Sequence, residues 1–345
     1  MLPTHNHVVP SVLAAAIALV AAGCGSSSTG SSSRATAAQT QSQPTSGPAP
    51  AIDQLTAAEH PASSQFPATN GRTLQQLASL ARPGPQLGAA TAIFTPGSQR
   101  EAFGLNTSSG AFIYAPSAVY VAPTPSSPAQ GPFLAPADPM GVAPAYRSKQ
   151  NAGPGDIQAI YAAQVPLPHA GTYAILALTR VGGTLLGSTG EIAVAATSPI
   201  PAVGARAPAV ATDTTASTHG NTALLTTRIP PETGMQAVSF GDVLGKRPVA
   251  LLFSTPQLCQ SRVCGPVTDI AAQLQHDLGS KITFIHEEVY VNNQPTKGLR
   301  PQLKAFHLQT EPWLFTVDRR GVIVARLEGA FGLNEFRQAI EAALR

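Results

Sequence analysis

Charged residues are scarce in this chain of 345 residues. Asp, Glu, Lys and Arg together make up 11% of it, and the formal net charge is +3. No stretch concentrates the Lys and Arg residues, and binding to phosphates requires such a concentration. The sequence therefore gives no electrostatic basis for binding nucleic acid. The length favours two folded units together with unstructured segments.

A long apolar run is also missing. The most apolar stretch, Val8 to Ala22, is too short to span a bilayer as a permanent helix. Its end, VAAGC, followed by GSSSTGSSS, resembles the signal and lipobox of bacterial lipoproteins, although no Lys or Arg precedes it. The resemblance implies a signal peptide over 1–23 and a lipid on Cys24 that anchors the mature chain to the extracytoplasmic face of the cell membrane. The alternative is an ordinary signal peptide or an apolar segment with an incidental Cys24.

Large apolar residues are almost absent between Gly25 and about Pro67. A segment of Ser, Thr, Gln, Ala and Pro cannot bury enough surface to offset its chain entropy. We therefore expect a disordered tether over 24–72. The pattern TLQQLASL, which begins at Thr73, predicts a brief helix at the edge of the next domain.

Cysteine is absent from the third segment, 73–200, where short apolar stretches alternate with Pro and Gly. This texture predicts a small all-β sandwich. The sequence PHAGTYAIL resembles the tyrosine corner of immunoglobulin-like domains, without their inter-sheet disulfide. We expect an immunoglobulin-like sandwich that binds a partner or spaces the C-terminal domain, followed by a linker over 201–231.

Alternating strand and helix patterns fill the last segment, 232–345. This order predicts a three-layer α/β domain with two parallel strands, a hairpin and a closing helix. The expected elements are a strand over Pro248–Phe253, a helix after Gly265-Pro266, a second central strand over Lys281–Val291, a helix over Pro301–Leu308, strands over Trp313–Val317 and Val322–Leu327, and a last helix capped by Asn334.

Three motifs of this segment resemble the thioredoxin-like superfamily. They are the strand, cysteine loop and helix over Val249–Leu278, the sequence TEPWLF, and the hairpin DRRGVIVARLEGAF. The resemblance covers about the last third of the chain. It implies that Pro312 follows a cis peptide bond and faces the cysteines, with Glu311, Pro312 and Trp313 in contact with the substrate.

The sequence departs from that family at two points. Its cysteines form C-x-x-x-x-C instead of C-x-x-C, and Val267 stands where the resolving cysteine belongs. The buried carboxylate of the preceding strand is also missing. Glu287 or Glu288 could substitute for it near the carboxyl end of the next strand, but solvated strand-end residues are the simpler interpretation.

The spacing of Cys259 and Cys264 restricts their placement. On one continuous helix their Cα atoms would lie roughly 8–9 Å apart, beyond the limit of about 7 Å for a disulfide. A disulfide between them therefore requires Cys259 in a loop with the helix starting after it, and the helical pattern after Gly265-Pro266 puts Cys264 at or just before the helix N-terminus. The helix dipole there favours a thiolate, so Cys264 is the expected acidic thiol. With Cys24 lipidated, an oxidising compartment favours a disulfide between the other two.

Three functions fit these features. The first is a thiol-disulfide oxidoreductase in which Cys259 and Cys264 act on protein thiols and disulfides outside the cytoplasm, without a cofactor. The second is a binding or structural lipoprotein with a thioredoxin fold and an inert disulfide. The third is copper handling, which resembles the copper-binding branch of the thioredoxin-like superfamily. That branch uses two cysteines and a distant histidine, and His286 and His307 lack its motif.

Overall fold

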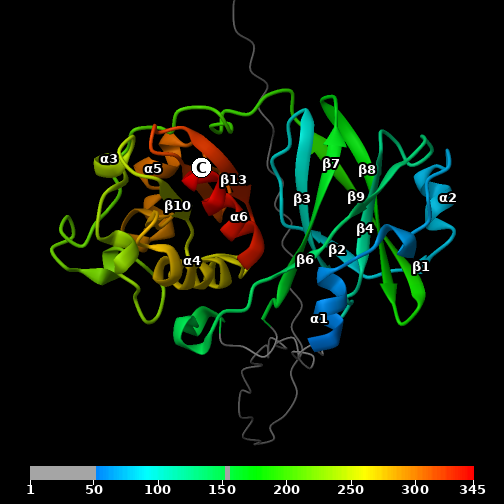
Figure 1. Ribbon diagram of the computed structural model, residues 1–345, viewed down its shortest axis with the longest axis horizontal. Coiled ribbons are helices and arrows are strands. Elements are labelled where there is room, and N and C mark those ends of the chain that lie inside the picture. Colours follow the sequence, from blue (N-terminus) through cyan, green and yellow to red (C-terminus); the bar gives the residue numbers. More distant parts are fainter. Residues whose placement is uncertain (1–51, 152–155) are drawn as a thin grey trace, which may run out of the picture. The chain divides into compact units, whose positions relative to one another are not determined.

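Three β-sheets form the framework of the part of the chain that the structure describes, residues 52–151 and 156–345 (Figure 1). The structure is a computed structural model. The described residues all belong to one compact unit. The expected signal peptide, the lipidated Cys24 and the tether as far as residue 51 lie outside the described residues.

The chain is ordered well before the expected end of the tether. Ala58 is fully buried and Phe66 is 7% exposed, and each joins a core cluster of the sandwich. The prediction of disorder is therefore wrong from residue 52 onward, because a few apolar anchors are enough to fix a segment that is otherwise polar. The elements before the first sheet are α1 (Ile52–Glu59), the 3₁₀ turn η1 (Ser63–Gln65) and α2 (Leu74–Ala78).

Two sheets pack against each other in the N-terminal half. One has the strand order β1-β9-β8-β4-β5 and the other β2-β3-β7-β6. Their strands are β1 (Arg82–Pro83), β2 (Gln86–Ala89), β3 (Gly97–Asn106), β4 (Ser117–Ala122), β5 (Gln130–Leu134), β6 (Ala137–Pro139), β7 (Ala159–Leu167), β8 (Gly171–Val181) and β9 (Thr184–Val194). The short turns η2 (Pro144–Tyr146) and η3 (Lys149–Asn151) lie between β6 and β7.

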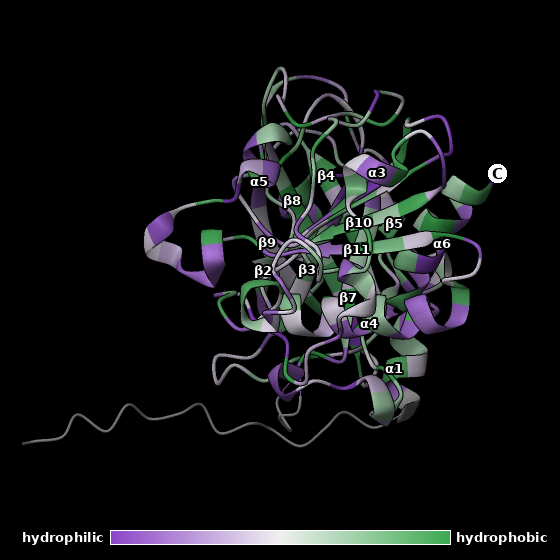
Figure 2. Cartoon of the chain, turned by 90° about the vertical axis from the view of Figure 1, so that its left-hand side faces the viewer, coloured by the Kyte–Doolittle hydropathy of each residue, from purple (hydrophilic) through white to green (hydrophobic). Residues whose placement is uncertain are grey.

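The two sheets share one apolar core. Alternate residues of β3 and β7, such as Phe103 and Tyr161, meet Val119 of β4 and Ile175 of β8 in a single buried cluster, as the two-residue period of strands requires. The hydroxyl of Tyr173 accepts a hydrogen bond from the His169 backbone N–H at 3.1 Å, so the tyrosine ties the turn before β8 to its own strand. Figure 2 colours stretches of the strands green, the colour of hydrophobic residues.

The third sheet belongs to the C-terminal α/β domain and has the order β11-β10-β12-β13. Strand β10 is parallel to β11 and antiparallel to β12. This is the expected order of two parallel strands joined by a helix, then a hairpin and a closing helix. The elements are α3 (Phe240–Val243), β10 (Val249–Phe253), α4 (Cys264–Leu278), β11 (Thr283–Glu287), α5 (Pro301–Ala305), β12 (Trp313–Val317), β13 (Ile323–Glu328) and α6 (Leu333–Leu344).

Helices cover both faces of this sheet. Ala250 and Leu252 of β10 pack with residues of α4 and α6, whereas Val249, Leu251 and Phe253 pack with residues of α3 and α5. Successive residues of β10 therefore serve opposite faces, which explains why this strand reads as a continuous apolar run. The result is a three-layer α/β arrangement with β10 inside the sheet.

Two details of this domain differ from the sequence expectations. Strand β11 is an edge strand that ends at Glu287, so it is shorter than the expected central strand over Lys281–Val291. The cap of α6 is not Asn334: the backbone N–H groups of Asn334 and Glu335 donate to the carboxylate of Asp138, each at 2.9 Å. Because Asp138 lies on β6 of the sandwich, no local sequence pattern could identify it.

The sandwich and the α/β domain contact each other extensively. The Arg100 guanidinium forms a two-pronged ion pair with Glu335, at 2.6 and 2.7 Å, and also donates to the carbonyls of Glu328 and Ala330. The segment expected as a linker over 201–231 lies along the α/β domain, where Ala207 N donates to Gly321 O at 2.9 Å. It contains the turn η4 (Thr222–Leu224), and η5 (Gly234–Gln236) follows it.

Candidate functional site

Cys259 and Cys264 lie at the carboxyl end of β10. Cys259 is in the loop, where its backbone N–H donates to Thr255 O at 3.1 Å. Cys264 is the first residue of α4, as the spacing predicted. Both are free thiols in the structure, which therefore shows the reduced form. The Cys259 side chain is partly exposed, whereas Cys264 is completely buried.

The acidity of the two thiols is opposite to the sequence expectation. A hydrogen bond from the Cys264 thiol, together with one from Ser261 at 3.2 Å between Sγ and Oγ, lowers the pKa of Cys259 to about 6. Burial raises the pKa of Cys264 well above its ordinary value. The prediction that Cys264 is the acidic thiol is thus wrong, because removal from water outweighs its position at the helix N-terminus.

The peptide bond between Glu311 and Pro312 is cis, as the resemblance implied. Glu311 is half-buried, and its pKa is raised by burial and by the neighbouring Cys259. It also contributes to the raised pKa of Cys264, so the carboxyl group lies near both thiols. These electrostatic effects place the Glu311 carboxyl group close to the cysteine pair.

Trp313 is enclosed, in contrast to the exposure expected of a substrate-binding residue. Its side chain is 2% exposed and stacks on Phe315, with ring centroids 5.7 Å apart. The indole Nε1–H donates to Thr310 Oγ1 at 3.0 Å. A residue so enclosed supports the strand that follows Pro312 and offers little surface to a substrate.

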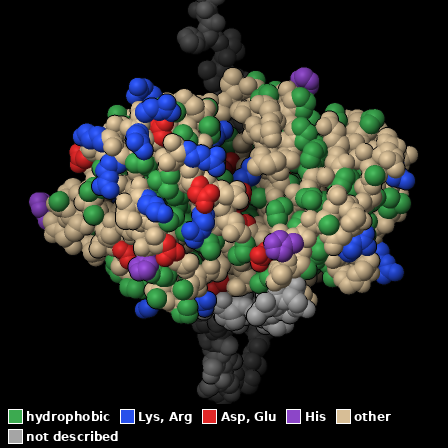
Figure 3. Space-filling view, viewed as in Figure 1, with side chains coloured by type: hydrophobic (Ala, Val, Ile, Leu, Met, Phe, Trp, Pro, Cys, Tyr) green, Lys and Arg blue, Asp and Glu red, His purple; other side chains and the backbone are tan. Residues whose placement is uncertain are grey.

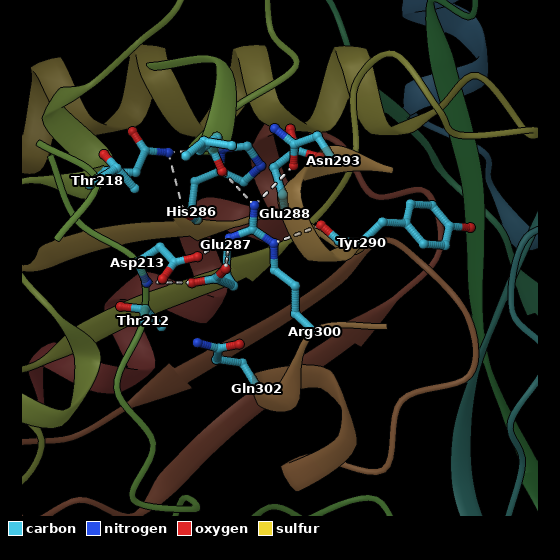
Figure 4. Close-up of polar contacts among 12 residues, drawn as sticks. Thr212, Asp213, Thr218, His286, Glu287, Glu288, Tyr290, Asn293, Arg300 and Gln302 are labelled. Atoms are coloured by element: carbon cyan, nitrogen blue, oxygen red, sulfur yellow. Dashed lines mark hydrogen bonds and ion pairs between the residues drawn. The ribbon is translucent and has the colours of Figure 1, made fainter. Parts of the chain in front are cut away.

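Glu287 is buried, not solvated, which corrects the simpler interpretation of the sequence. The Arg300 guanidinium lies 2.5 Å from its carboxylate, and the Asp213 backbone N–H donates to it at 3.0 Å (Figure 4). Burial raises the pKa of Glu287 to about 7 despite this ion pair. These contacts tie the 211–213 segment to the end of β11.

Glu288 is also fully buried, and Thr255 is a neighbour that it shares with Cys264. One carboxylate oxygen accepts hydrogen bonds from the Thr227 backbone N–H and hydroxyl, at 2.6 and 2.9 Å. The other oxygen has no hydrogen-bond partner among the described residues, and neither has the Thr255 hydroxyl. Thr255 is nevertheless close enough to lower the pKa of Glu288, which burial raises to about 7. The backbone of Thr255 also interacts with the Cys264 sulfur.

The two histidines of the copper hypothesis, His286 and His307, belong to no group of metal-ligating side chains among the described residues. His286 is buried between Ser254 O, 3.0 Å from its Nε2, and Gln236 Nε2, 3.2 Å from its Nδ1. Burial lowers the pKa of His286 to about 4, so the ring is neutral at pH 7. Among the described residues, no three His, Cys, Asp or Glu side chains are grouped to hold a metal ion.

Comparison with known proteins gives little. No protein-family model and no curated protein matches the chain. One solved structure is described as a putative thiol:disulfide interchange protein DsbE from Chlorobium tepidum. Its alignment with this chain covers 42% of this chain and 99% of the DsbE chain, with a TM-score of 0.30 and 16% sequence identity. At that TM-score the similarity supports no conclusion about this chain. Within residues 52–151 and 156–345, no helix has the length and apolar character needed to cross a membrane.

Proposed function

We propose that this protein is a thioredoxin-like thiol-disulfide oxidoreductase in which Cys259 attacks and Cys264 resolves. The observation that supports the proposal most is the pairing of a partly exposed, acidic thiol with a buried thiol that donates a hydrogen bond to it. The thiolate is the nucleophile in disulfide exchange, so the accessible thiol of low pKa is the one suited to attack.

In the first step the Cys259 thiolate attacks one sulfur of a substrate disulfide. A bond forms between Cys259 Sγ and that sulfur, the substrate S–S bond breaks, and the second substrate sulfur leaves as a thiolate that takes a proton from water. The hydrogen bonds of Cys264 and Ser261 hold the thiolate ready before the substrate arrives. Glu311 beside Cys259 is positioned to meet the incoming peptide.

In the second step the Cys264 thiolate attacks Cys259 Sγ, and the substrate sulfur that was bound to Cys259 leaves as a thiolate. The substrate disulfide has then gained two electrons, and Cys259 and Cys264 have formed a disulfide. Cys264 must first lose its proton, which burial opposes. Glu288 is the proton acceptor in this proposal, because its pKa of about 7 is suited to exchange near neutral pH, and because Thr255 interacts with Glu288 through its side chain and with Cys264 through its backbone. The steps are reversible, so a dithiol substrate is oxidised by the same route.

Trapping of mixed disulfides tests this assignment. Cys264→Ser leaves the attacking thiol without its resolving partner and is expected to accumulate mixed disulfides with a model disulfide protein, detectable on non-reducing gels. Cys259→Ser is expected to trap almost none, because its remaining thiol is buried. If neither variant traps a partner and both only lower thermal stability, the disulfide is structural, and the binding or structural alternative replaces this function.

The proposal also places the enzyme outside the cytoplasm, anchored by a lipid on Cys24. Its support is the VAAGC sequence followed by a polar segment. Cys24→Ser should move the protein from the membrane fraction to the soluble fraction while leaving its circular dichroism and thiol reactivity unchanged. Retention of the variant in the membrane fraction would contradict the anchor without affecting the redox proposal.

A further inference from the structure

Thr227 holds the Glu288 carboxylate through one of its two oxygens. The backbone N–H and the hydroxyl of Thr227 both donate to Oε1, at 2.6 and 2.9 Å. Oε2 has no hydrogen-bond partner within the described part of the chain. A carboxylic acid carries its proton on one oxygen, and Oε1 already accepts two donors. A proton that reaches Glu288 is therefore held on Oε2.

The same hydroxyl also binds the cysteine loop. The Gln257 backbone N–H donates to Thr227 Oγ1 at 3.1 Å, and Gln257 lies two residues before Cys259 in the sequence. A hydroxyl group has one hydrogen to donate and two lone pairs to accept with, so it serves Glu288 and the loop at the same time. Thr227 Oγ1 thus connects the carboxylate directly to the loop that carries Cys259.

Contacts on both sides of Thr227 fix its position independently of Glu288. Gln150, from the turn between β6 and β7, donates through its side chain to Thr227 O at 3.0 Å and accepts from Ile229 N at 3.1 Å. The next residue, Arg228, is buried, and its Nε donates to Asp269 Oδ1 of α4 at 2.9 Å. The sandwich and the cysteine helix therefore both hold the backbone that presents the Thr227 hydroxyl.

The ionisation of Glu288 depends on these bonds. Burial raises its pKa to about 7, and the hydrogen bonds of Thr227 act against that rise because they stabilise the ionised carboxylate. Arg300 is the charged group that also lowers this pKa. Its guanidinium is bonded to Glu287 and Asn293 (Figure 4), so it does not depend on Thr227. Loss of the Thr227 hydroxyl alone should therefore raise the pKa of Glu288 further.

We propose that Thr227 is a positioning residue that aligns Glu288 with the cysteine loop and directs the proton of Cys264 to Oε2. This inference rests on the proposed function, in which Glu288 accepts that proton. The proton moves from Cys264 Sγ to Glu288 Oε2, the thiolate attacks Cys259 Sγ, and the bond from Cys259 to the substrate sulfur breaks. Thr227 acts through Glu288 and the loop and takes no part in the exchange of bonds. The segment expected as a linker thus contributes to the site.

A chromogenic disulfide resolves the two steps on the full reduced protein. Dithiodipyridine releases one thiopyridone when Cys259 attacks and another when Cys264 resolves, and stopped-flow absorbance follows both phases. This probe is neutral, which suits a protein whose displayed face carries Lys and Arg side chains among Asp and Glu side chains over the α/β domain (Figure 3).

Thr227→Val keeps the shape of the side chain and removes the hydroxyl. We expect its first phase to be nearly unchanged, because Cys259 keeps the hydrogen bonds of Cys264 and Ser261. The second phase should be roughly fivefold slower at pH 7, with its midpoint about one pH unit higher, the effect of losing one hydrogen bond to a charged group. Thr227→Ser retains the hydroxyl and should keep the wild-type midpoint. Thr227→Ala, which adds no atom, carries the same expectation as Thr227→Val and replaces it if that variant does not fold.

Two further variants separate positioning from general stability. Thr316→Val removes a buried hydrogen bond, from Thr316 Oγ1 to Ala339 O at 2.8 Å, near the start of β10 and away from the cysteine loop, and should keep both phases. Thr227→Val added to Glu288→Gln should slow the second phase no further, because Thr227 acts through Glu288.

The outcomes distinguish this inference from the function on which it rests. An unchanged second phase in Thr227→Val, an equal loss in Thr227→Ser or Thr316→Val, or a full additional loss in the double variant would overturn the role of Thr227 and leave the oxidoreductase standing. A wild-type protein that releases no thiopyridone, or only the first, would instead overturn the proposed function, and this inference with it.

Discussion

Arg228 and Asp269 form a buried ion pair, with 2.9 Å between Nε and Oδ1 and side chains that are 5% and 0% exposed. Removal of one partner leaves the other charge buried and unpaired, which costs about 3–5 kcal/mol. We therefore expect Asp269→Ala to lower the free energy of unfolding in urea by that amount. Asp277→Ala, on the exposed side of the same helix, is the control and should change stability by less than about 0.5 kcal/mol. Similar losses in both variants would contradict a special role for the pair.

The pKa of Cys259 predicts an unusual pH profile for alkylation. In the reduced protein the rate with iodoacetamide should rise through a midpoint near 6 and then remain flat, because the thiolate of Cys259 is already formed. Cys264→Ala removes the hydrogen bond that contributes most to this acidity, so the midpoint should move to higher pH. A midpoint above 8 in the wild type would refute the assignment of Cys259 as the attacking thiol.

Glu288→Gln separates the two steps of exchange. The amide can still accept the hydrogen bonds of Thr227, but it cannot take a proton from Cys264. We expect resolution of the mixed disulfide to slow by about 10²-fold or more and to lose its dependence on a group with a pKa near 7. Stopped-flow measurement of the first step, which should be unaffected, is the internal control. An unchanged rate of resolution would exclude Glu288 as the proton acceptor.

Asp138 of the sandwich caps α6 in the α/β domain. Asp138→Ala should destabilise the protein by about 0.5–2 kcal/mol, the usual cost of a lost N-cap, measured by denaturant unfolding. Asn334→Ala tests the cap that the sequence suggested, and it should have little effect because only the Asn334 backbone N–H is used. A larger loss of stability in Asn334→Ala than in Asp138→Ala would show that Asn334 is the cap.

Glu101 gives the stability a defined dependence on pH. Its side chain is 1% exposed, one of its oxygens has no partner among the described residues, and burial raises its pKa to about 8. A raised pKa in the folded state contributes stability that is fully present below the unfolded pKa of 4.5 and is lost as pH rises through 8. Glu101→Gln should therefore increase the melting temperature near pH 8.5 more than near pH 4. An equal effect at both pH values would show that Glu101 is not neutral in the fold.

Much of the α/β domain could be predicted from the sequence because its signals are local. The apolar run of β10, the helical spacing after Pro266 and the turn at DRRG each depend on neighbouring residues, and all three elements are present in the structure. The requirement that the two cysteines can form a disulfide likewise predicted Cys259 outside the helix, and the structure has Cys259 in the loop before α4.

Tertiary structure alone decided the chemistry around those cysteines. The helix dipole favours the thiolate form of Cys264, but the burial of Cys264 raises its pKa above that of Cys259. Glu288 looked solvated because its partner Thr227 is 61 residues away in the sequence. Asp269 gave no signal for the same reason, as its partners come from the sandwich and from the segment before α3. Burial and long-range hydrogen bonds are properties of the assembled fold, and no local pattern encodes them.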